Sequence, residues 1–313
     1  MRIGVDIMGG DFAPKAAVLG AIKVYNELPA DIKLVLIGNK KQIIDILNKE
    51  GVDESGFEIV HADQVIEMGD HPAKAFTAKP NSSIAVGFGL LHKKMIDGFA
   101  SAGNTGAMLV GTMYTIKAIP GVIRPCISSE MPQLNGKHSI ILDVGINPDC
   151  KPDVLYQYGV MGSVYAQNVY GIEKPKVALL NIGSEEQKGN LIVKSTYDLM
   201  QGSKDFNFIG NVEGHQLFGN CPADVVVCDG FTGNVVLKEA EGFYRIIKSR
   251  KINDDFFENF NFEHYGGTPV LGVNSTVIIG HGASNAKAVK SMILKTKNVI
   301  EAKISEKLIE IYQ

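Results

Sequence analysis

The feature that most constrains the fold is a regular alternation of short apolar runs with longer segments of helical periodicity. Apolar runs of strand length lie at residues 2–7, 32–38, 57–61, 98–102, 139–145, 176–183, 206–212, 223–230 and 275–280. Helical patterns lie at residues 14–28, 40–50, 81–96, 152–170, 189–202 and 232–250, and a last amphipathic helix begins near Ser284. Strands that are apolar throughout and are followed by helices are typical of a parallel sheet covered on both faces. The alternation therefore predicts a three-layer α/β/α fold with a mostly parallel sheet.

Nothing in the sequence marks a boundary between domains. The 313 residues contain no internal repeat, no low-complexity tract and no linker rich in Pro or Ser. A chain of this length fits one large α/β domain or two modest ones. We interpret residues 1–313 as a single α/β/α domain.

Composition and charge exclude several classes of protein. The formal net charge of −3 lacks the basic excess that is typical of nucleic-acid binding. No apolar run approaches the roughly 20 residues of a membrane span, and the apolar run at the start is too short for a signal peptide. The four cysteines form no C-x-x-C pair and have no zinc-binding spacing, so free thiols and no metal site are expected. The sequence predicts a cytoplasmic protein, attached to a membrane at most from its inner face.

Turns that combine Gly with Asn, Asp, Ser or Thr follow the predicted strands. They lie at residues 6–11, 101–106, 143–147, 181–189, 210–214, 229–234 and 280–285. A single turn of this kind often only connects a strand to a helix and binds no ligand. Because ligands bind at the carboxyl ends of the strands in a parallel sheet, these turns are expected to converge on one cleft.

The expected cleft suits a small anion such as phosphate. Backbone N–H groups at helix starts, together with Asn, Ser and Thr side chains, bind oxyanions. The turn S-A-G-N-T-G-A at 101–107 precedes a helical pattern, so we predict that Gly103, Asn104, Thr105 and Gly106 bind phosphate. A glycine-rich helix cap with no ligand is the alternative interpretation.

Charged residues at the strand ends add to this expectation. Lys188 brings a positive charge to the start of a helix, although Glu185 and Glu186 beside it also fit a surface ion-pair cluster. Carboxylates at four strand ends are suited to orienting donors or to holding a metal; they are Asp6, Asp143, Glu185 and Asp229. The P-loop, the dinucleotide fingerprint after the first strand, the nucleophile elbow and the H-E-x-x-H motif are all absent.

Seven motifs in order along the chain resemble the bacterial phosphate acyltransferase family, the acyl-[acyl-carrier-protein]:phosphate acyltransferases of phospholipid synthesis. They are G-V-D-I-M-G-G-D-F-A-P (4–14), S-A-G-N-T-G-A (101–107), N-I-G-S-E-E-Q-K-G-N (181–190), G-N-V-E-G (210–214), D-G-F-T-G-N (229–234), Y-G-G-T-P-V-L-G-V (265–273) and H-G-A-S-N-A-K (281–287). The resemblance extends from about Ile3 to the final helix. It implies a fold similar to the isocitrate and isopropylmalate dehydrogenases, a homodimer, and no nucleotide cofactor.

The resemblance also implies the reaction, in which inorganic phosphate attacks the thioester of an acylated carrier protein. A membrane glycerol-3-phosphate acyltransferase would then use the acyl phosphate. Phosphate is already an anion, so the site needs to hold it beside the thioester and to supply donors to the developing oxyanion. We assign catalysis to Lys188, Asp229 and Asn234. Substrate contacts are expected from Asp6, Asn147, Asn181, Ser184, Glu185 and His281.

The segment 242–264 mixes aromatic and basic residues. In the family it resembles a protruding helical tip that touches the membrane near the acyl channel. Contact with the carrier protein or with anionic lipid is expected from its basic side chains, Arg245, Lys248, Arg250 and Lys251. The alternative is a helical arm that packs on a second subunit, with its charges in solvent.

Three other functions fit the expected fold. A metal- and NAD-dependent decarboxylating dehydrogenase would need several arginines for a hydroxy-diacid, and Arg occurs only at 2, 124, 245 and 250. A short-chain phosphate acyltransferase that uses coenzyme A and a non-catalytic acyl-binding protein also remain open.

Overall fold

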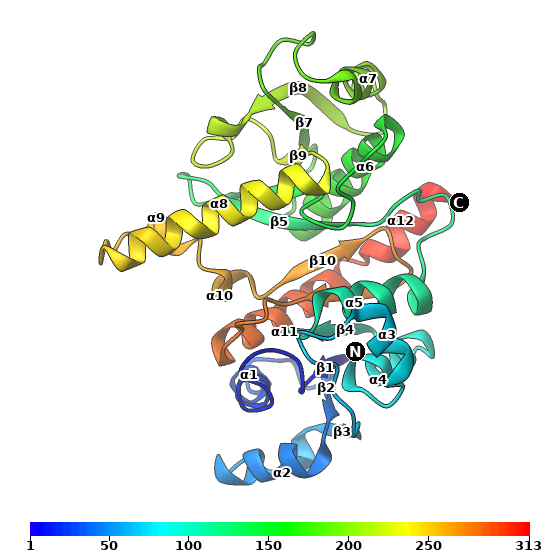
Figure 1. Ribbon diagram of the computed structural model, residues 1–313, viewed down its shortest axis with the longest axis vertical. Coiled ribbons are helices and arrows are strands. Elements are labelled where there is room, and N and C mark those ends of the chain that lie inside the picture. The colour runs from blue at the N-terminus through cyan, green and yellow to red at the C-terminus, as the bar shows by residue number, and fades with distance from the viewer. The chain divides into compact units, whose positions relative to one another are not determined.

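The computed structural model describes all 313 residues, which form two compact units (Figure 1). Unit 1 comprises Met1–Lys117 and Phe262–Glu301, and unit 2 comprises Ala118–Asn261 and Ala302–Gln313. Each unit has strands, helices and an apolar core of its own. A single domain over residues 1–313 stays a prediction.

The strands of unit 1 follow the order β3-β2-β1-β4-β11-β10. Their bounds are β1 (Arg2–Asp6), β2 (Lys33–Gly38), β3 (Glu58–His61), β4 (Gly98–Ser101), β10 (Thr268–Leu271) and β11 (Thr276–Ile279). All neighbouring pairs in this order are parallel except β10 and β11, which are antiparallel. The prediction of a mostly parallel sheet is confirmed here.

Helices cover both faces of the unit 1 strands. They are α1 (Lys15–Tyr25), α2 (Lys40–Lys49), α3 (Pro72–Ala78), α4 (Ser83–His92), α5 (Thr105–Gly111), α10 (Phe262–Tyr265) and α11 (Ala286–Glu301). Successive residues of a strand point to opposite faces. In β4, Gly98 lies against Thr296 of α11, whereas its neighbour Phe99 packs on Phe88 of α4 with ring centroids 5.2 Å apart. The two helices therefore form separate layers, as predicted, with α1 beside α11 (Figure 1).

The strands of unit 2 follow the order β5-β6-β9-β7-β8. Their bounds are β5 (Cys126–Pro132), β6 (His138–Leu142), β7 (Lys176–Asn181), β8 (Asn207–Glu213) and β9 (Val225–Val227). The β5–β6 pair is antiparallel and the other three pairs are parallel. The helices are α6 (Pro152–Val169), α7 (Leu191–Met200), α8 (Gly230–Ser249), α9 (Asp255–Glu258) and α12 (Ile304–Tyr312). Helix α6 packs on the sheet, where Gly162 lies against Leu142 and Val225, and α7 and α12 pack on α6.

Four features differ from the sequence-based expectation. Strands β5 and β10 and helix α3 were not predicted, because polar residues or Pro interrupt their apolar patterns. The prediction of one long helix from Ser284 is wrong. Helix α11 ends at Glu301, Lys303 adopts a left-handed φ of 52°, and α12 begins at Ile304. The break allows Ile304 and Leu308 to be buried in unit 2 next to α6.

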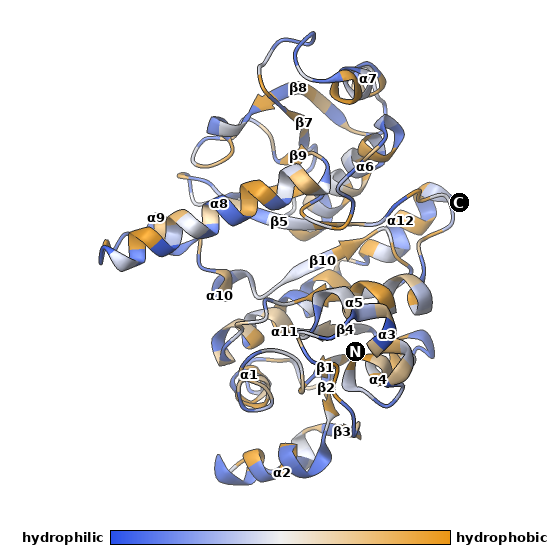
Figure 2. Ribbon diagram, in the orientation of Figure 1, coloured by the Kyte–Doolittle hydropathy of each residue, from blue (hydrophilic) through white to orange (hydrophobic).

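Helix α8 is largely uncovered along its length. Of its 20 residues only Gly230 and Gly233, in the first turn, are buried, yet hydrophobic residues continue toward its far end (Figure 2). Phe243 is 65% exposed and Ile246 is 57% exposed. The segment 242–264 consists of the end of α8, a turn, α9 and the start of α10; that it protrudes stays a prediction. No helix of the protein combines the length and hydrophobicity that crossing a membrane requires.

Candidate active site

In unit 1 the ends of three neighbouring strands meet at one edge of the sheet. The N–H of Asp11, after β1, donates to the carbonyl of Gly282, after β11, at 2.8 Å. The N–H of Gly280 donates to the carbonyl of Ser101 at the end of β4, also at 2.8 Å. The turns that follow β1, β4 and β11 are therefore in direct contact, which is the arrangement that parallel strands predict within this unit.

Asp6 organises the turn after β4 from beneath. Its carboxylate accepts the Ser101 hydroxyl at 2.6 Å and the Met8 N–H at 2.9 Å, and the Ser101 Oγ in turn accepts the N–H of Gly103 at 2.9 Å. Burial raises the pKa of Asp6, although these hydrogen bonds act in the opposite direction. Asp6 and Ser101 are fully buried, so their observed role is to hold the loop; contact of Asp6 with substrate stays a prediction.

The loop that contains Asn104 has three free N–H groups. The Asn104 amide is already used, because Oδ1 accepts the Ala107 N–H and Nδ2 donates to the carbonyls of Glu67, Met68 and Asp70. The backbone N–H groups of Asn104, Thr105 and Gly106 have no acceptor within the protein. Together they form the first turn of α5, where a partial positive charge attracts anions.

Two glycines fix the position of this turn. A Cβ on Gly103 would lie 3.1 Å from Ser101 Oγ and 3.2 Å from the Cα of Gly9, and a Cβ on Gly106 would lie 2.3 Å from the ring of Pro72 in α3. Gly103 and Gly106 therefore permit the close packing of the loop. Of the four residues predicted to bind phosphate, only Thr105 has an exposed side chain free for a ligand.

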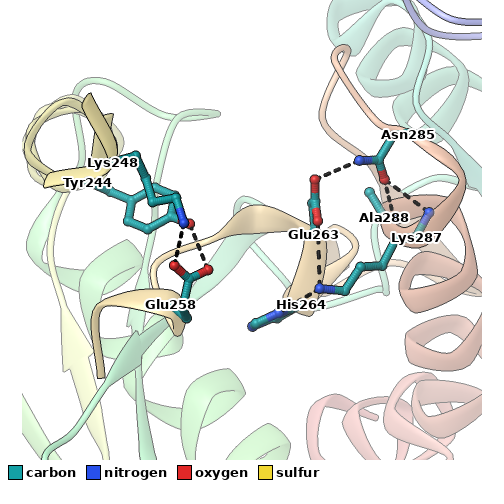
Figure 3. Close-up of polar contacts among 8 residues, drawn as sticks. All are labelled: Tyr244, Lys248, Glu258, Glu263, His264, Asn285, Lys287 and Ala288. Atoms are coloured by element: carbon teal, nitrogen blue, oxygen red, sulfur yellow. Dashed lines mark hydrogen bonds and ion pairs between the residues drawn. The ribbon is translucent and has the colours of Figure 1, made fainter. Parts of the chain in front are cut away.

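His281, after β11, has local contacts. Its ring stacks on Phe262 with centroids 4.5 Å apart, and its Nδ1 accepts the N–H of Ala283 at 3.1 Å. In the next turn the Asn285 side chain caps α11 and donates to Glu263, which also pairs with Lys287 at 3.7 Å (Figure 3). These contacts fix the loop 281–285; substrate binding by His281 stays a prediction.

In unit 2 the buried carboxylate of Asp143, after β6, organises the corresponding turn. Its two oxygens accept the N–H groups of Ile127, Gly145, Ile146 and Asn147 at 2.7–3.3 Å. The Asn147 side chain donates to the Pro125 carbonyl at 2.7 Å and to Asp143 at 3.2 Å. Asn147 is therefore committed to the loop in this structure.

Helix α8 begins directly against this loop. Asp229 is its N-cap and accepts both the N–H and the hydroxyl of Thr232 at 2.8 Å. The Gly230 N–H donates to the Asn147 carbonyl at 2.8 Å, and the Asn234 amide donates to the Val144 carbonyl at 3.2 Å. The structure thus brings the predicted residues Asn147, Asp229 and Asn234 together at one edge of the unit 2 sheet.

The loop 181–190, after β7, carries Lys188. The Asn181 side chain holds the loop closed, because its Nδ2 donates to the Lys188 carbonyl at 3.1 Å and its Oδ1 accepts the Ile182 N–H at 2.8 Å. Ser184, Glu185 and Lys188 are exposed. The Lys188 ammonium makes no ion pair with Glu185 or another carboxylate, which argues against the ion-pair cluster as its role.

A cavity of about 670 Å³ lies within unit 2 at these strand ends. Asn181, Gly189 and Asn190 line it from one loop, and Asp229 and Thr232 line it from the start of α8. Cys150 and Cys228 also line it, but burial raises the pKa of both thiols. Protonated thiols are weak nucleophiles, so the cavity offers donors and carboxylates rather than a cysteine nucleophile.

The basic residues at the end of α8 differ in their contacts. Lys248 pairs with Glu258 of α9 at 2.6 Å, and Tyr244 donates to the same carboxylate (Figure 3). Arg245, Arg250 and Lys251 are exposed and have no ion pair. Three of the four predicted contact residues therefore have free charges.

Sequence reasoning gave no role to Ser101 and Thr232, although both stand in the motifs. Ser101 links Asp6 to Gly103, and Thr232 is held by Asp229 at both of its polar groups. The sequence signal that could have indicated these two residues is a Ser or Thr close to the glycines of a turn at a strand end. Within the protein no group of three or more His, Cys, Asp or Glu is placed to hold a metal ion.

Comparison with known proteins decides the family. The chain matches the family described as "Fatty acid synthesis protein" over residues 1–307. The phosphate acyltransferase of Dictyoglomus turgidum is 42% identical over 329 aligned residues, which cover 99% of this chain and 97% of the relative. This chain belongs to the phosphate acyltransferase family. The enzyme of Acetivibrio thermocellus is also 42% identical, with 98% and 95% covered. The phosphate acyltransferase assignment made from the motifs is confirmed, and the dehydrogenase alternative loses its support.

Solved structures show the same fold at low sequence identity. A phosphotransacetylase from Streptococcus pyogenes superposes with a TM-score of 0.69 at 18% identity, with 98% of this chain and 94% of the other covered. The EutD phosphotransacetylase of Staphylococcus aureus gives 0.64 at 16% identity, with 96% and 94% covered. The α/β fold class is confirmed for this phosphate acyltransferase.

Proposed function

We propose that this phosphate acyltransferase moves a fatty acyl group from the thioester of an acyl carrier protein to inorganic phosphate. A phosphate oxygen attacks the thioester carbonyl carbon, the new C–O bond forms, the C–S bond breaks, and the carrier leaves as a thiolate. The acyl phosphate then serves phospholipid synthesis through a membrane glycerol-3-phosphate acyltransferase. As the family resemblance implies, the proposed reaction uses no nucleotide cofactor.

The observation that carries the proposal is the set of free N–H groups at Asn104, Thr105 and Gly106. A turn whose only unpaired polar groups are donors is suited to an oxyanion. The assignment of phosphate to this loop also agrees with the burial of Asp6, whose carboxyl supports the loop through Ser101 and is not exposed to a ligand.

The direct test is to incubate the enzyme with acyl carrier protein thioester and phosphate and to measure acyl phosphate. The same assay with acyl-CoA separates the carrier-dependent reaction from the short-chain alternative. Faster formation of acyl phosphate from acyl-CoA than from the carrier thioester would show that acyl-CoA, and not the carrier thioester, is the acyl donor. Binding of the acyl group without any acyl phosphate would indicate a non-catalytic acyl-binding protein.

Thr105→Ala is expected to raise the KM for phosphate about tenfold with a smaller change in KM for the thioester. The hydroxyl supplies one hydrogen bond to a charged group, which contributes about 1.5 kcal/mol or more. Initial rates at varied phosphate measure the change, and Thr115→Ala, farther along the same helical segment, serves as the control. An unchanged phosphate KM in Thr105→Ala would leave this turn a helix cap.

The proposed roles in unit 2 rest on charge and donors. Lys188 interacts with phosphate or with the charge that grows on the thioester oxygen, and Asn234 donates to the same charge. Asp229 caps the start of α8 through the N–H and hydroxyl of Thr232 and so orients the Asn234 donor one turn further on. Asn181, Ser184 and Glu185 are proposed to contact the substrate from the loop after β7. The support is that Lys188 is exposed and unpaired and that Asn181 and Asp229 line one cavity.

We further propose that the enzyme is a homodimer, as the family resemblance implies. The support within the chain is the uncovered apolar side of α8, because an exposed patch of this kind usually meets a partner. Light scattering at micromolar concentration is expected to give about twice the monomer mass of 33.8 kDa. A purely monomeric solution contradicts the proposal.

Weak, reversible contact with an anionic membrane or with an acidic carrier protein is proposed for the end of α8. Its free charges are Arg245, Arg250 and Lys251, each worth about 1 kcal/mol at an anionic surface. Changing all three to Glu is expected to abolish sedimentation with anionic liposomes at low salt. Equal sedimentation of both proteins removes the membrane role, and an unchanged KM for the acyl carrier protein removes the docking role.

A further inference from the structure

Strand β8 contains an irregularity at the motif G-N-V-E-G, residues 210–214. Sequence reasoning predicts a turn there, but residues 210–213 lie within β8 (Asn207–Glu213). In the pairing with β7, Val177 lies opposite Phe208 and Leu179 lies opposite Asn211. Between these pairs β7 has only residue 178, whereas β8 has residues 209 and 210. The extra residue makes a β-bulge, a feature that can redirect a side chain beside an active site.

Gly210 provides the backbone conformation of this bulge. Its φ of 97° lies in the left-handed region that favours glycine. In a regular strand Phe208 and Asn211, three residues apart, would point to opposite faces. Because of the extra residue, both lie opposite alternate residues of β7, which share one face. The bulge therefore turns Asn211 to the face on which Phe208 packs against Tyr197 of α7.

From this position the Asn211 side chain makes a single hydrogen bond. Its Nδ2 donates to the Glu185 carbonyl at 3.0 Å, and the N–H of Lys188 donates to the same carbonyl at 3.1 Å. The Oδ1 of Asn211 is buried and has no hydrogen-bond partner within the protein. The turn 185–188 is thus fixed at its start by Asn211 and at its end by Asn181, which donates to the Lys188 carbonyl.

The turn 185–188 depends on these hydrogen bonds. All of its residues are exposed, so it gains little from apolar burial, and segments of this kind open easily. A buried amide oxygen without a partner lowers stability, so Asn211 is poorly suited to stabilising β8. What its amide provides is the contact with the turn that carries Lys188.

We propose that Asn211 is a positioning residue for the acyl transfer, which holds the turn 185–188 so that the Lys188 ammonium stays at the substrate. Gly210 belongs to the same arrangement, because its bulge directs Asn211 to the turn. This inference rests on the proposed function, in which Lys188 stabilises negative charge. Without the Asn211 contact the turn is free to move, and a displacement of about 1 Å at a reacting group lowers the rate strongly.

The first experiment observes the turn without using the reaction. Asn211→Leu keeps the shape of the side chain and removes both polar atoms, while the Glu185 carbonyl keeps the Lys188 N–H as its donor. Hydrogen exchange of the peptide 182–190, measured by mass spectrometry on the intact enzyme, is expected to become about tenfold faster. The temperature of unfolding is expected to stay the same.

Asn207→Leu is the matched control, because Asn207 is exposed at the start of the same strand. It is expected to leave the exchange of the peptide 182–190 unchanged. Exchange in Asn211→Leu that equals exchange in the unchanged enzyme overturns the proposal.

The second experiment measures initial rates of acyl phosphate formation. Asn211→Leu is expected to lower kcat about tenfold, while the KM for the carrier thioester stays within about twofold. In the Lys188→Ala background the same substitution is expected to change kcat less than about twofold, because Asn211 acts through Lys188. An equal loss of kcat in both backgrounds overturns the proposal, since Asn211 would then act independently of Lys188.

Gly210→Ala tests the bulge against Gly202→Ala, in the turn after α7. Both glycines have a positive φ, 97° and 77°, and an added Cβ would meet no atom closer than 3.8 Å at Gly210 and none within 4 Å at Gly202. Both variants are therefore expected to lose similar stability, but only Gly210→Ala is expected to lower kcat and to speed exchange of the peptide 182–190. Equal kcat in the two variants overturns the role of the bulge. If the unchanged enzyme forms no acyl phosphate while Asn211→Leu still speeds the exchange, the proposed function is wrong and Asn211 remains the anchor of the turn.

Discussion

Replacing Lys188 with Ala is expected to lower kcat by about 100-fold or more. Loss of one group that stabilises developing charge typically costs about 2.7–4 kcal/mol of transition-state stabilisation. The Lys188 side chain is exposed and makes no ion pair, so its removal leaves no buried partner without a charge. The loop itself is held by the Asn181 contact with the Lys188 carbonyl, which the substitution keeps. Stability is therefore expected to change little.

Steady-state rates and thermal unfolding measure the two effects separately. Lys194→Ala is a matched control, because Lys194 is also exposed and lies in α7, directly after the same loop. Lys188→Arg keeps the charge and is expected to recover part of the rate. A loss below threefold in Lys188→Ala, or an equal loss in Lys194→Ala, would show that Lys188 has no specific part in the reaction.

The parallel core could be predicted because its strands are apolar on both faces. Val5 in β1, Leu36 in β2 and Val226 in β9 all lie in uninterrupted apolar runs and are fully buried. The antiparallel strand β5 was missed because Ser128, Ser129 and Glu130 interrupt its run. Such residues become part of the sheet through antiparallel pairing with the next strand, β6, in which Ser129 lies opposite Ile141 and Glu130 opposite Ile140. The pairing does not require β5 itself to be an apolar run.

The site could be predicted at the level of turns but not of hydrogen bonds. Strand ends carry the motifs because parallel strands expose their carboxyl ends at one edge. However, the Gly103 N–H, expected to face a ligand, donates to Ser101 instead, and the Asn104 amide holds the carbonyls of residues 67–70. The segment 67–70 stands more than 30 residues away in the sequence, so no spacing within the motif could indicate these contacts. They shift the phosphate prediction from side chains to the N–H groups of residues 104–106.

The start of α8 depends on the absence of one side chain. Gly233 lies in its first turn, and a Cβ there would come within 2.0 Å of the Asp143 carbonyl oxygen and 3.0 Å of Cys228 Sγ. The oxygen that a Cβ would meet is the backbone carbonyl oxygen of Asp143. The side-chain carboxylate of Asp143 is fixed by the N–H groups of the turn 145–147. The contact cannot be relieved by a rotamer change. A side chain at 233 must therefore move the start of α8, together with Asp229 and Asn234.

Gly233→Ala is expected to lower the free energy of unfolding by about 1–3 kcal/mol, as overpacking of a rigid core does, and to reduce kcat at least tenfold. The loss opposes the gain of up to about 1 kcal/mol that Ala brings over Gly inside a helix. Gly242→Ala, in the same helix with open space around it, has only the gain and is expected to be slightly more stable with full activity. Urea unfolding and initial rates on the two variants measure the difference. If Gly233→Ala matches Gly242→Ala in both stability and rate, the close approach of α8 to the turn after β6 is not what positions Asp229 and Asn234.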